Sequence, residues 1–62
     1  MKLWIARDES GGLWMFESKP IKVRESFTQQ PLSQIYSIDD NLFPEVTFEN
    51  SPMEVEIVLK NE

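Results

Sequence analysis

Carboxylates are the main chemical groups of this 62-residue chain, which contains no histidine and no cysteine. If residues 45–49 and 53–59 form a β-hairpin, four of them share its outer face: Glu45, Glu49, Glu54 and Glu56. Like charges facing each other across strands are destabilising, so such a face requires counter-charges. Three sources could supply positive charge: Lys22 and Arg24 on a neighbouring strand, a Ca²⁺ ion, or a basic partner. To a basic partner, the carboxylates would resemble a phosphate backbone. Internal pairing or plain solvation is favoured over a partner surface.

The sequence favours a protein without metal, cofactor or catalytic activity. Calcium is disfavoured because its loops bring ligands from a tight glycine-containing turn, which residues 45–56 lack. Asp39 and Asp40 resemble a catalytic carboxylate pair, but adjacent residues seldom point into one site, and acids are common at helix starts. No histidine is present to activate a serine, and Gly11–Gly12 is not followed by the Lys-Ser/Thr of a phosphate loop.

Aromatic residues offer a second kind of binding surface. Some of the seven rings must fill the core, but an exposed Trp4 or Trp14 would suit a binding hot spot. The predicted binding residues are therefore these two tryptophans together with the four glutamates.

Charge is distributed unevenly along the chain, whose net charge is −5. Residues 1–24 contain five basic and three acidic side chains, whereas residues 25–62 contain one basic and eight acidic ones. Nucleic-acid binding is disfavoured because it needs clustered basic residues. We expect the two halves to pair within one fold, with an acidic docking face as the alternative.

Two apolar, aromatic runs near the N-terminus predict a β-hairpin. Residues 2–7 and 13–17 flank a loop that contains Gly11 and Gly12. Both runs are apolar on both faces, which is typical of strands covered on both sides or of strands with one face open for binding. We expect the covered arrangement.

The middle of the chain carries weaker signals. Residues 21–25 alternate apolar and charged side chains and predict a half-buried strand. Residues 33–38 alternate weakly, with Ile35 or else Tyr36 and Ile38 facing in, and either form another strand or lead into the next turn. Residues 26–31 lack periodicity, so we expect a mobile excursion anchored by Phe27. Residues 39–43 fit a single helical or 3₁₀ turn that ends at Pro44.

The clearest strands are predicted at residues 45–49 and 53–59, where apolar residues on one face oppose the glutamates and Thr47 on the other. Their apolar faces predict a core that includes Val46, Phe48, Val55 and Ile57. The resulting fold class is mainly β: a small antiparallel meander or open barrel of five to six short strands with one helical or 3₁₀ turn, in a single domain over residues 1–62.

The segments WIARDESGGLWMFESKP, residues 4–20, and IDDNLFPEVTFENSPMEVEIVL, residues 38–59, resemble a family of short uncharacterised proteins from anaerobic gut bacteria, their prophages and mobile elements. The resemblance covers most of the chain except about residues 21–34. That family has no assigned activity, so the resemblance implies no site residue. It implies a small intracellular protein.

These features lead to an expected function and location. The chain has no cysteine and therefore no disulfide that would indicate an oxidising compartment. The apolar run of residues 3–6 is too short for a signal peptide or a membrane span, so we expect a cytoplasmic protein. We expect a non-enzymatic protein-interaction module, such as an accessory or inhibitor protein of a mobile element, with a protein partner and no nucleic-acid or membrane binding. The alternatives are a self-associating homodimer and an accessory subunit of a larger enzyme.

Overall fold

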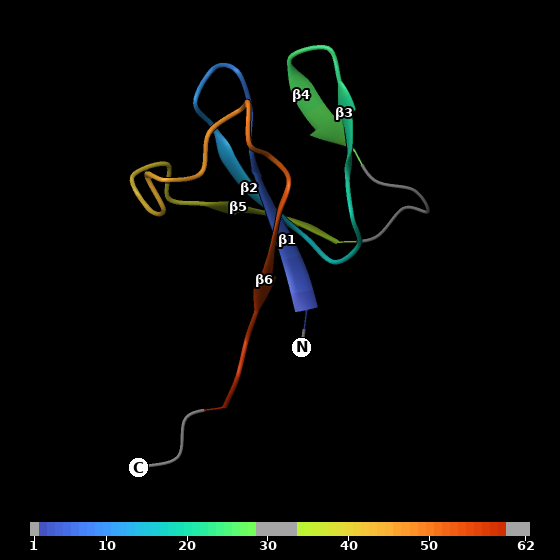
Figure 1. The fold of residues 1–62 in the computed structure, drawn as a ribbon, viewed down its shortest axis with the longest axis vertical. Helices are drawn as coiled ribbons and strands as arrows, with labels where there is room; N and C mark the ends of the chain where they lie inside the picture. The colour runs from blue at the N-terminus through green and yellow to red at the C-terminus, as the bar shows by residue number, and fades with distance from the viewer. Residues whose placement is uncertain (1, 29–33, 60–62) are drawn as a thin grey trace.

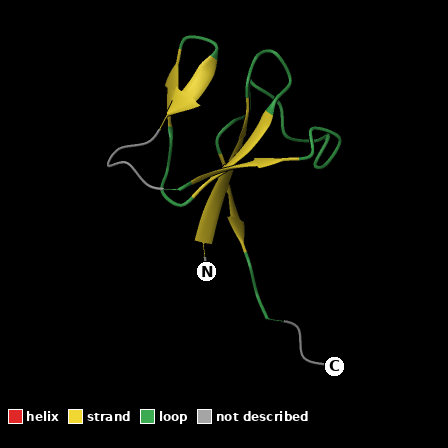
Figure 2. Cartoon of the chain, turned by 180° about the vertical axis from the view of Figure 1, so that it is seen from behind, coloured by secondary structure: helices red, strands yellow, loops and turns green. Residues whose placement is uncertain are grey.

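A computed structural model describes residues 2–28 and 34–59. Its main feature is an open, four-stranded antiparallel sheet in the order β5-β2-β1-β6, beside which stands a separate two-stranded hairpin (Figure 1). The sheet contains β1 (Lys2–Arg7), β2 (Leu13–Phe16), β5 (Ile35–Ile38) and β6 (Met53–Glu56), and the hairpin contains β3 (Ile21–Val23) and β4 (Ser26–Thr28). Figure 2 shows strands and loops in the described ranges and no helix. The predicted mainly β fold is confirmed, as an open sheet.

The predicted N-terminal hairpin is confirmed by the pairing of β1 with β2. The Asp8 N–H donates to the Gly12 carbonyl over 2.8 Å, and the Gly11 N–H donates to the Asp8 carbonyl over 2.9 Å. Gly11 has a φ of 104°, a backbone conformation that side chains disfavour, so glycine suits this turn. The glycine signal in the sequence therefore marked the correct connection.

Both faces of the central strands are covered, as expected for runs that are apolar on both sides. On one face, here called the Ile5 face, Ile5 and Leu13 pack against Val46. On the other, here called the Phe16 face, Ala6 and Phe16 pack against Phe27 of the hairpin. Ile5 is 3% exposed and Phe16 is 1% exposed, so each face has its own small core.

The predicted strand at residues 45–49 is wrong. These residues form turns, and β6 pairs with β1 rather than with this segment. Val46 packs on the Ile5 face while Phe48 packs on the Phe16 face, so the segment passes around the end of β1 instead of lying flat beside it. The side chain of Asn50 holds the turn, because its Oδ1 accepts from the Thr47 N–H over 2.8 Å and its Nδ2 donates to the Glu45 carbonyl over 2.9 Å.

The predicted half-buried strand at residues 21–25 is shorter and oriented the opposite way. Ile21 and Val23 are 55% and 46% exposed, whereas Lys22, opposite Phe27 in the register, reaches towards the Phe16-face core. The expectation of an excursion at residues 26–31 is wrong where it can be compared, because β4 pairs with β3, and residues 29–31 lie outside the described residues. Phe27 is 9% exposed, which confirms its role as the anchor.

Three further expectations have definite outcomes. The strand expected at residues 33–38 is present over Ile35–Ile38 as β5, whereas residue 34 is not part of it and residue 33 lies outside the described residues. The single helical or 3₁₀ turn expected at residues 39–43 is present as one isolated turn, in which the Leu42 N–H donates to the Asp39 carbonyl over 3.0 Å, the i to i+3 bond of a 3₁₀ turn. Of the four predicted core residues, Val46 is buried, Phe48 and Val55 are half-buried, and Ile57 is 51% exposed and therefore wrongly predicted.

Candidate functional site

Arg7, at the end of β1, organises the Ile5 face through its guanidinium group. Its Nε donates to the Val46 carbonyl over 2.6 Å. The remaining four hydrogen bonds, of 2.8 to 3.1 Å, run from its two terminal nitrogens to the carbonyls of Gly11, Asp40, Leu42 and Phe43. An arginine side chain has five N–H donors, so all of them are used. Arg7 is therefore a positioning residue that fixes the loop over residues 40–46.

The aspartates of that loop have structural partners. Asp40 Oδ1 accepts from the Leu13 N–H over 3.0 Å, which ties the loop to β2. Asp39 Oδ1 accepts from the Asn41 N–H over 2.9 Å, which is the local bond of an Asx turn. The capping interpretation of this pair therefore holds for Asp39, which starts this single turn.

An apolar groove lies on the Ile5 face beneath this loop. Its volume is about 280 Å³, with Ile5 and Met15 contributed by β1 and β2. Leu42 and Phe43 of the loop also line it, as do Val55 and Ile57 from β6 and the residues after it. Leu42 is 49% and Phe43 is 44% exposed, so the groove is bordered by large apolar side chains that solvent reaches.

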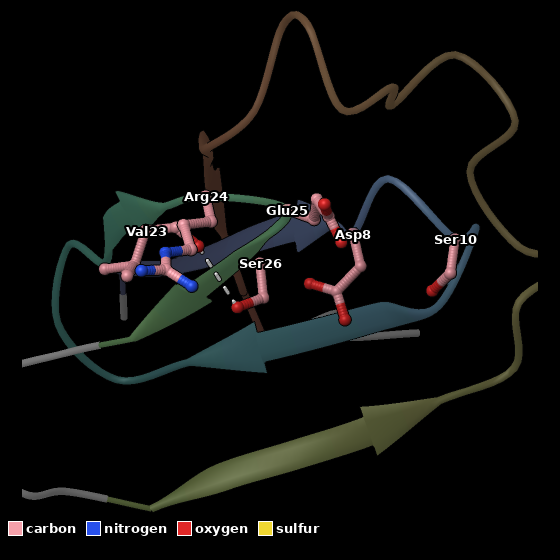
Figure 3. Close-up of a pocket in the computed structure, with 6 residues that line it drawn as sticks. All are labelled: Asp8, Ser10, Val23, Arg24, Glu25 and Ser26. Carbon is pink, nitrogen blue, oxygen red and sulfur yellow. Dashed lines mark hydrogen bonds between the residues drawn. The ribbon is translucent and has the colours of Figure 1, made fainter.

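A polar cleft lies where the loop between β1 and β2 meets the turn between β3 and β4. Its volume is about 410 Å³, and its lining is shown in Figure 3: Asp8, Ser10, Val23, Arg24, Glu25 and Ser26. The two loops are joined by a 3.0 Å hydrogen bond from the Glu9 N–H to the Glu25 carbonyl.

The side chains of this cleft are engaged in structural contacts rather than arranged as a reactive pair. Asp8 Oδ2 accepts from Trp14 Nε1 over 2.9 Å, and the Ser26 hydroxyl donates to the Val23 carbonyl over 3.4 Å. Figure 3 shows Ser26 between Arg24 and Asp8, with Ser10 beyond them. The arrangement offers hydrogen bonds to a polar ligand but no base directed at the serine hydroxyl.

The four glutamates predicted to share a hairpin face do not do so. Glu54 and Glu56 lie on β6, opposite Trp4 and Lys2 of β1, whereas Glu45 and Glu49 belong to the turns that precede β6. No cluster of three or more metal-binding side chains occurs within residues 2–28 and 34–59.

The expected counter-charges of the glutamates are also elsewhere. Lys22 Nζ donates to the Phe48 carbonyl over 3.1 Å and lies 4.1 Å from the centre of the Phe48 ring. Arg24 lines the polar cleft instead. An internal lattice of these two cations with the glutamates is therefore not the arrangement of the described residues.

The two tryptophans lie at the edge of the Phe16-face core. Trp4 is half-buried, with Lys19 Nζ 5.5 Å from the centre of its ring, and Trp14 is half-buried with its indole N–H bonded to Asp8. A shallow hollow next to the polar cleft is lined by Trp14, Phe16, Phe27 and Ile35 as well as Asp8. Packing already accounts for much of the surface of both indoles.

Sequence reasoning missed both Arg7 and the pair Leu42 and Phe43. The available signal was an arginine at the end of a buried strand and two adjacent large apolar residues in a segment rich in turn-forming aspartates. The hydrogen-bond partners of Arg7 are main-chain carbonyls, which every residue possesses, so the sequence does not reveal which residues Arg7 contacts.

Comparisons with known proteins give no relative for this chain: no family model, no curated protein and no solved structure matches it. In the described residues, no helix has the length and apolar character needed to span a membrane.

Proposed function

We propose that this chain is a small, non-enzymatic protein-interaction module that binds its partner through the apolar groove of the Ile5 face. The observation that carries the proposal is the border of the groove, where Leu42, Phe43 and Ile57 are each between 44% and 51% exposed. Contiguous exposed apolar surface on a small protein is typical of an interaction site.

The fixed conformation of the groove border supports this proposal. The loop that presents Leu42 and Phe43 is held by the guanidinium of Arg7 and by the Asp40 carboxylate. A surface that is already ordered loses less conformational entropy when a partner binds. Glu56 also lines the groove, and its negative charge disfavours nucleic acid as the partner.

We also propose that the chain is an accessory or inhibitor protein that acts on another protein in the cytoplasm. Its resemblance to short proteins of prophages and mobile elements supports this role. Binding at the groove would act by covering a surface of that protein, without chemistry by this chain. Cell fractionation of the native host tests the location.

Site-specific photo-crosslinking tests the docking site. A photoreactive amino acid is placed at Leu42, on the groove, or at Val23, which is 46% exposed on the separate hairpin and serves as the matched control. We expect one protein to be crosslinked reproducibly from position 42 and not from position 23. Equal products from both positions would contradict the proposal.

A variant of the purified pair gives the quantitative measure. Phe43 has a φ of 50°, a conformation that asparagine tolerates, so Phe43→Asn removes the ring with little change to the backbone. We expect the affinity for the crosslinked partner to fall at least about tenfold, as for an interface hot spot. An unchanged affinity would exclude the groove as the docking site.

A further inference from the structure

The lining of the apolar groove limits what can enter it. Ile5 is buried and Met15 and Ile38 are half-buried beneath the groove, while Leu42 and Phe43 stand exposed at its border. Its volume of about 280 Å³ lies just below the usual range of pockets that hold drug-sized molecules. A few apolar side chains that project from a larger partner therefore suit the groove better than a free small molecule.

The main chain at the border of the groove is already hydrogen-bonded. The Leu42 and Phe43 carbonyls accept from Arg7. The Leu42 N–H donates to the Asp39 carbonyl over 3.0 Å, and Pro44 has no N–H. An extended partner segment would receive few main-chain partners from this border, whereas a helix satisfies its main-chain groups internally. The groove therefore favours a helix, whose apolar residues at i, i+3, i+4 and i+7 form one face.

The elements that line the groove are acidic. β1, β2, β5, β6 and the segment of residues 39–46 together carry five acidic side chains and two basic ones. The acidic residues are Asp39, Asp40, Glu45, Glu54 and Glu56, and the basic ones are Lys2 and Arg7. All five donors of Arg7 bond to main-chain carbonyls, which leaves none for a carboxylate of a partner. Basic side chains on the partner therefore complement this surface.

We infer that the groove takes an amphipathic helix of another protein, with apolar residues on the face that enters the groove and lysine or arginine residues along its flanks. This inference rests on the proposed function, because it names the partner segment of the same groove. A second copy of this chain is a poor candidate, since its described residues contain no helix and its net charge of −5 repels an identical molecule. An acidic helix and an extended segment are the alternatives that the following experiments separate.

Three synthetic peptides of about 18 residues serve as probes, a length at which an isolated helix can form. Two of them have leucines along one helical face, and these differ in carrying either lysine or glutamate at the flanking positions. The third has the composition of the lysine peptide in an order that removes the apolar face. Fluorescence anisotropy of each labelled peptide, titrated with the chain, gives its dissociation constant.

We expect the lysine peptide to bind at least about tenfold more tightly than either of the other two. Its advantage over the glutamate peptide should shrink between about 50 and about 500 mM salt, because salt screens exposed charges. Equal affinities of the lysine and glutamate peptides, or no saturable binding of the lysine peptide, would overturn the inference.

The place of binding is measured by the amide chemical shifts of the isotope-labelled chain. The lysine peptide should shift the amides of Ile5, Met15 and Leu42, which line the groove. The amides of Val23 and Ser26, on the separate hairpin, should stay nearly unchanged. Shifts centred on the hairpin instead of the groove would reject the proposed site for the helix.

A pair of charge-neutralising substitutions tests the acidic residues. Asp39→Asn with Glu45→Gln removes two charges beside the groove border, and an asparagine oxygen can still accept from the Asn41 N–H as Asp39 Oδ1 does. Glu9→Gln with Glu25→Gln, near the polar cleft, changes the net charge equally and is the matched control. We expect the first pair to weaken binding of the lysine peptide at least about threefold and the control to have a smaller effect. Equal losses would mean that net charge alone attracts the peptide, against the inference.

Failure of this inference and failure of the proposed function give different results. A specific crosslink from Leu42 without binding of the lysine peptide in the groove would reject the basic helix and leave the interaction function standing. Mass spectrometry of the crosslinked partner identifies the segment that lies at position 42. A segment with apolar residues at helical spacing and flanking lysine or arginine residues is the expected result, and an acidic or strand-forming segment would contradict it.

Discussion

Arg7 shows how one side chain can order a small fold through main-chain contacts alone. Its guanidinium donates to carbonyls that belong to the turn after β1 and to the loop over residues 40–46. The rigid, planar arrangement of five donors is specific to arginine, and lysine offers three donors on a single nitrogen. Arginine is therefore chemically required at this position.

Replacing Arg7 by lysine should destabilise the protein by about 2 kcal/mol or more, because hydrogen bonds to charged groups contribute more than neutral ones. Urea denaturation followed by circular dichroism measures the loss. The matched control is Arg24→Lys, whose side chain lies in the polar cleft and should change the denaturation midpoint little. Equal midpoints for the two variants would contradict the assigned role of Arg7.

Lys22 shows why a residue pattern does not determine which face of a strand points inward. Alternation of apolar and charged residues placed Ile21 and Val23 inside, yet the Lys22 side chain packs over the Phe48 ring and donates to the carbonyl of the same residue. Contact between a cation and an aromatic ring stabilises such a lysine at the border of a core. The two β-branched residues are left on the solvent side of a short strand.

The turn between β3 and β4 contains backbone strain that a substitution can relieve. Arg24 has a φ of 56°, the left-handed region that glycine adopts without a steric penalty. Arg24→Gly should therefore raise the free energy of unfolding by about 0.5–1 kcal/mol, measured from the urea midpoint. Glu25→Gly, at the neighbouring position without a positive φ, is the control and should lower it. A destabilised Arg24→Gly chain would disprove the argument from strain.

The elements that the sequence predicted correctly are those whose signals are local. The hairpin of β1 and β2 has a glycine-containing turn between two apolar runs, and both properties act within a few residues. The pairing of β6 was predicted wrongly because alternation defines the two faces of a strand but not its neighbour. Residues 45–49 alternate as strictly as a strand, but Arg7 and Asn50 satisfy their main-chain groups in turns.

Across the whole molecule, the core is located in the central strands rather than near the C-terminus. Ile5→Ala should cost about 2–5 kcal/mol, because Ile5 is 3% exposed and its truncation leaves a cavity. Ile57→Ala should cost less than about 1 kcal/mol in thermal or urea denaturation, because Ile57 is 51% exposed. A larger loss for Ile57→Ala than for Ile5→Ala would contradict this location of the core.

The candidate site was only partly predictable at this scale. Glu54 and Glu56 were correctly predicted to lie on one strand, whereas Ile57 of the same segment was wrongly placed in the core. The surroundings of the strand depend on β1, which lies about 50 residues away in the sequence. Leu42 and Phe43 have no strand or helix pattern that would mark them as exposed. Their position follows from the bonds of Arg7, which form only in the folded chain.

The residues that pack on the two faces of the β1–β2 hairpin lie C-terminal to it in the sequence, which has a consequence for biosynthesis. The β1–β2 hairpin leaves the ribosome first, but the residues that cover it, Phe27 on one face and Val46 on the other, are translated later. The carbonyls that Arg7 binds extend to residue 46 as well. During synthesis the hairpin is therefore uncovered and its arginine hydrated until residue 46 has been translated, so neither face of the hairpin can complete its packing before that point.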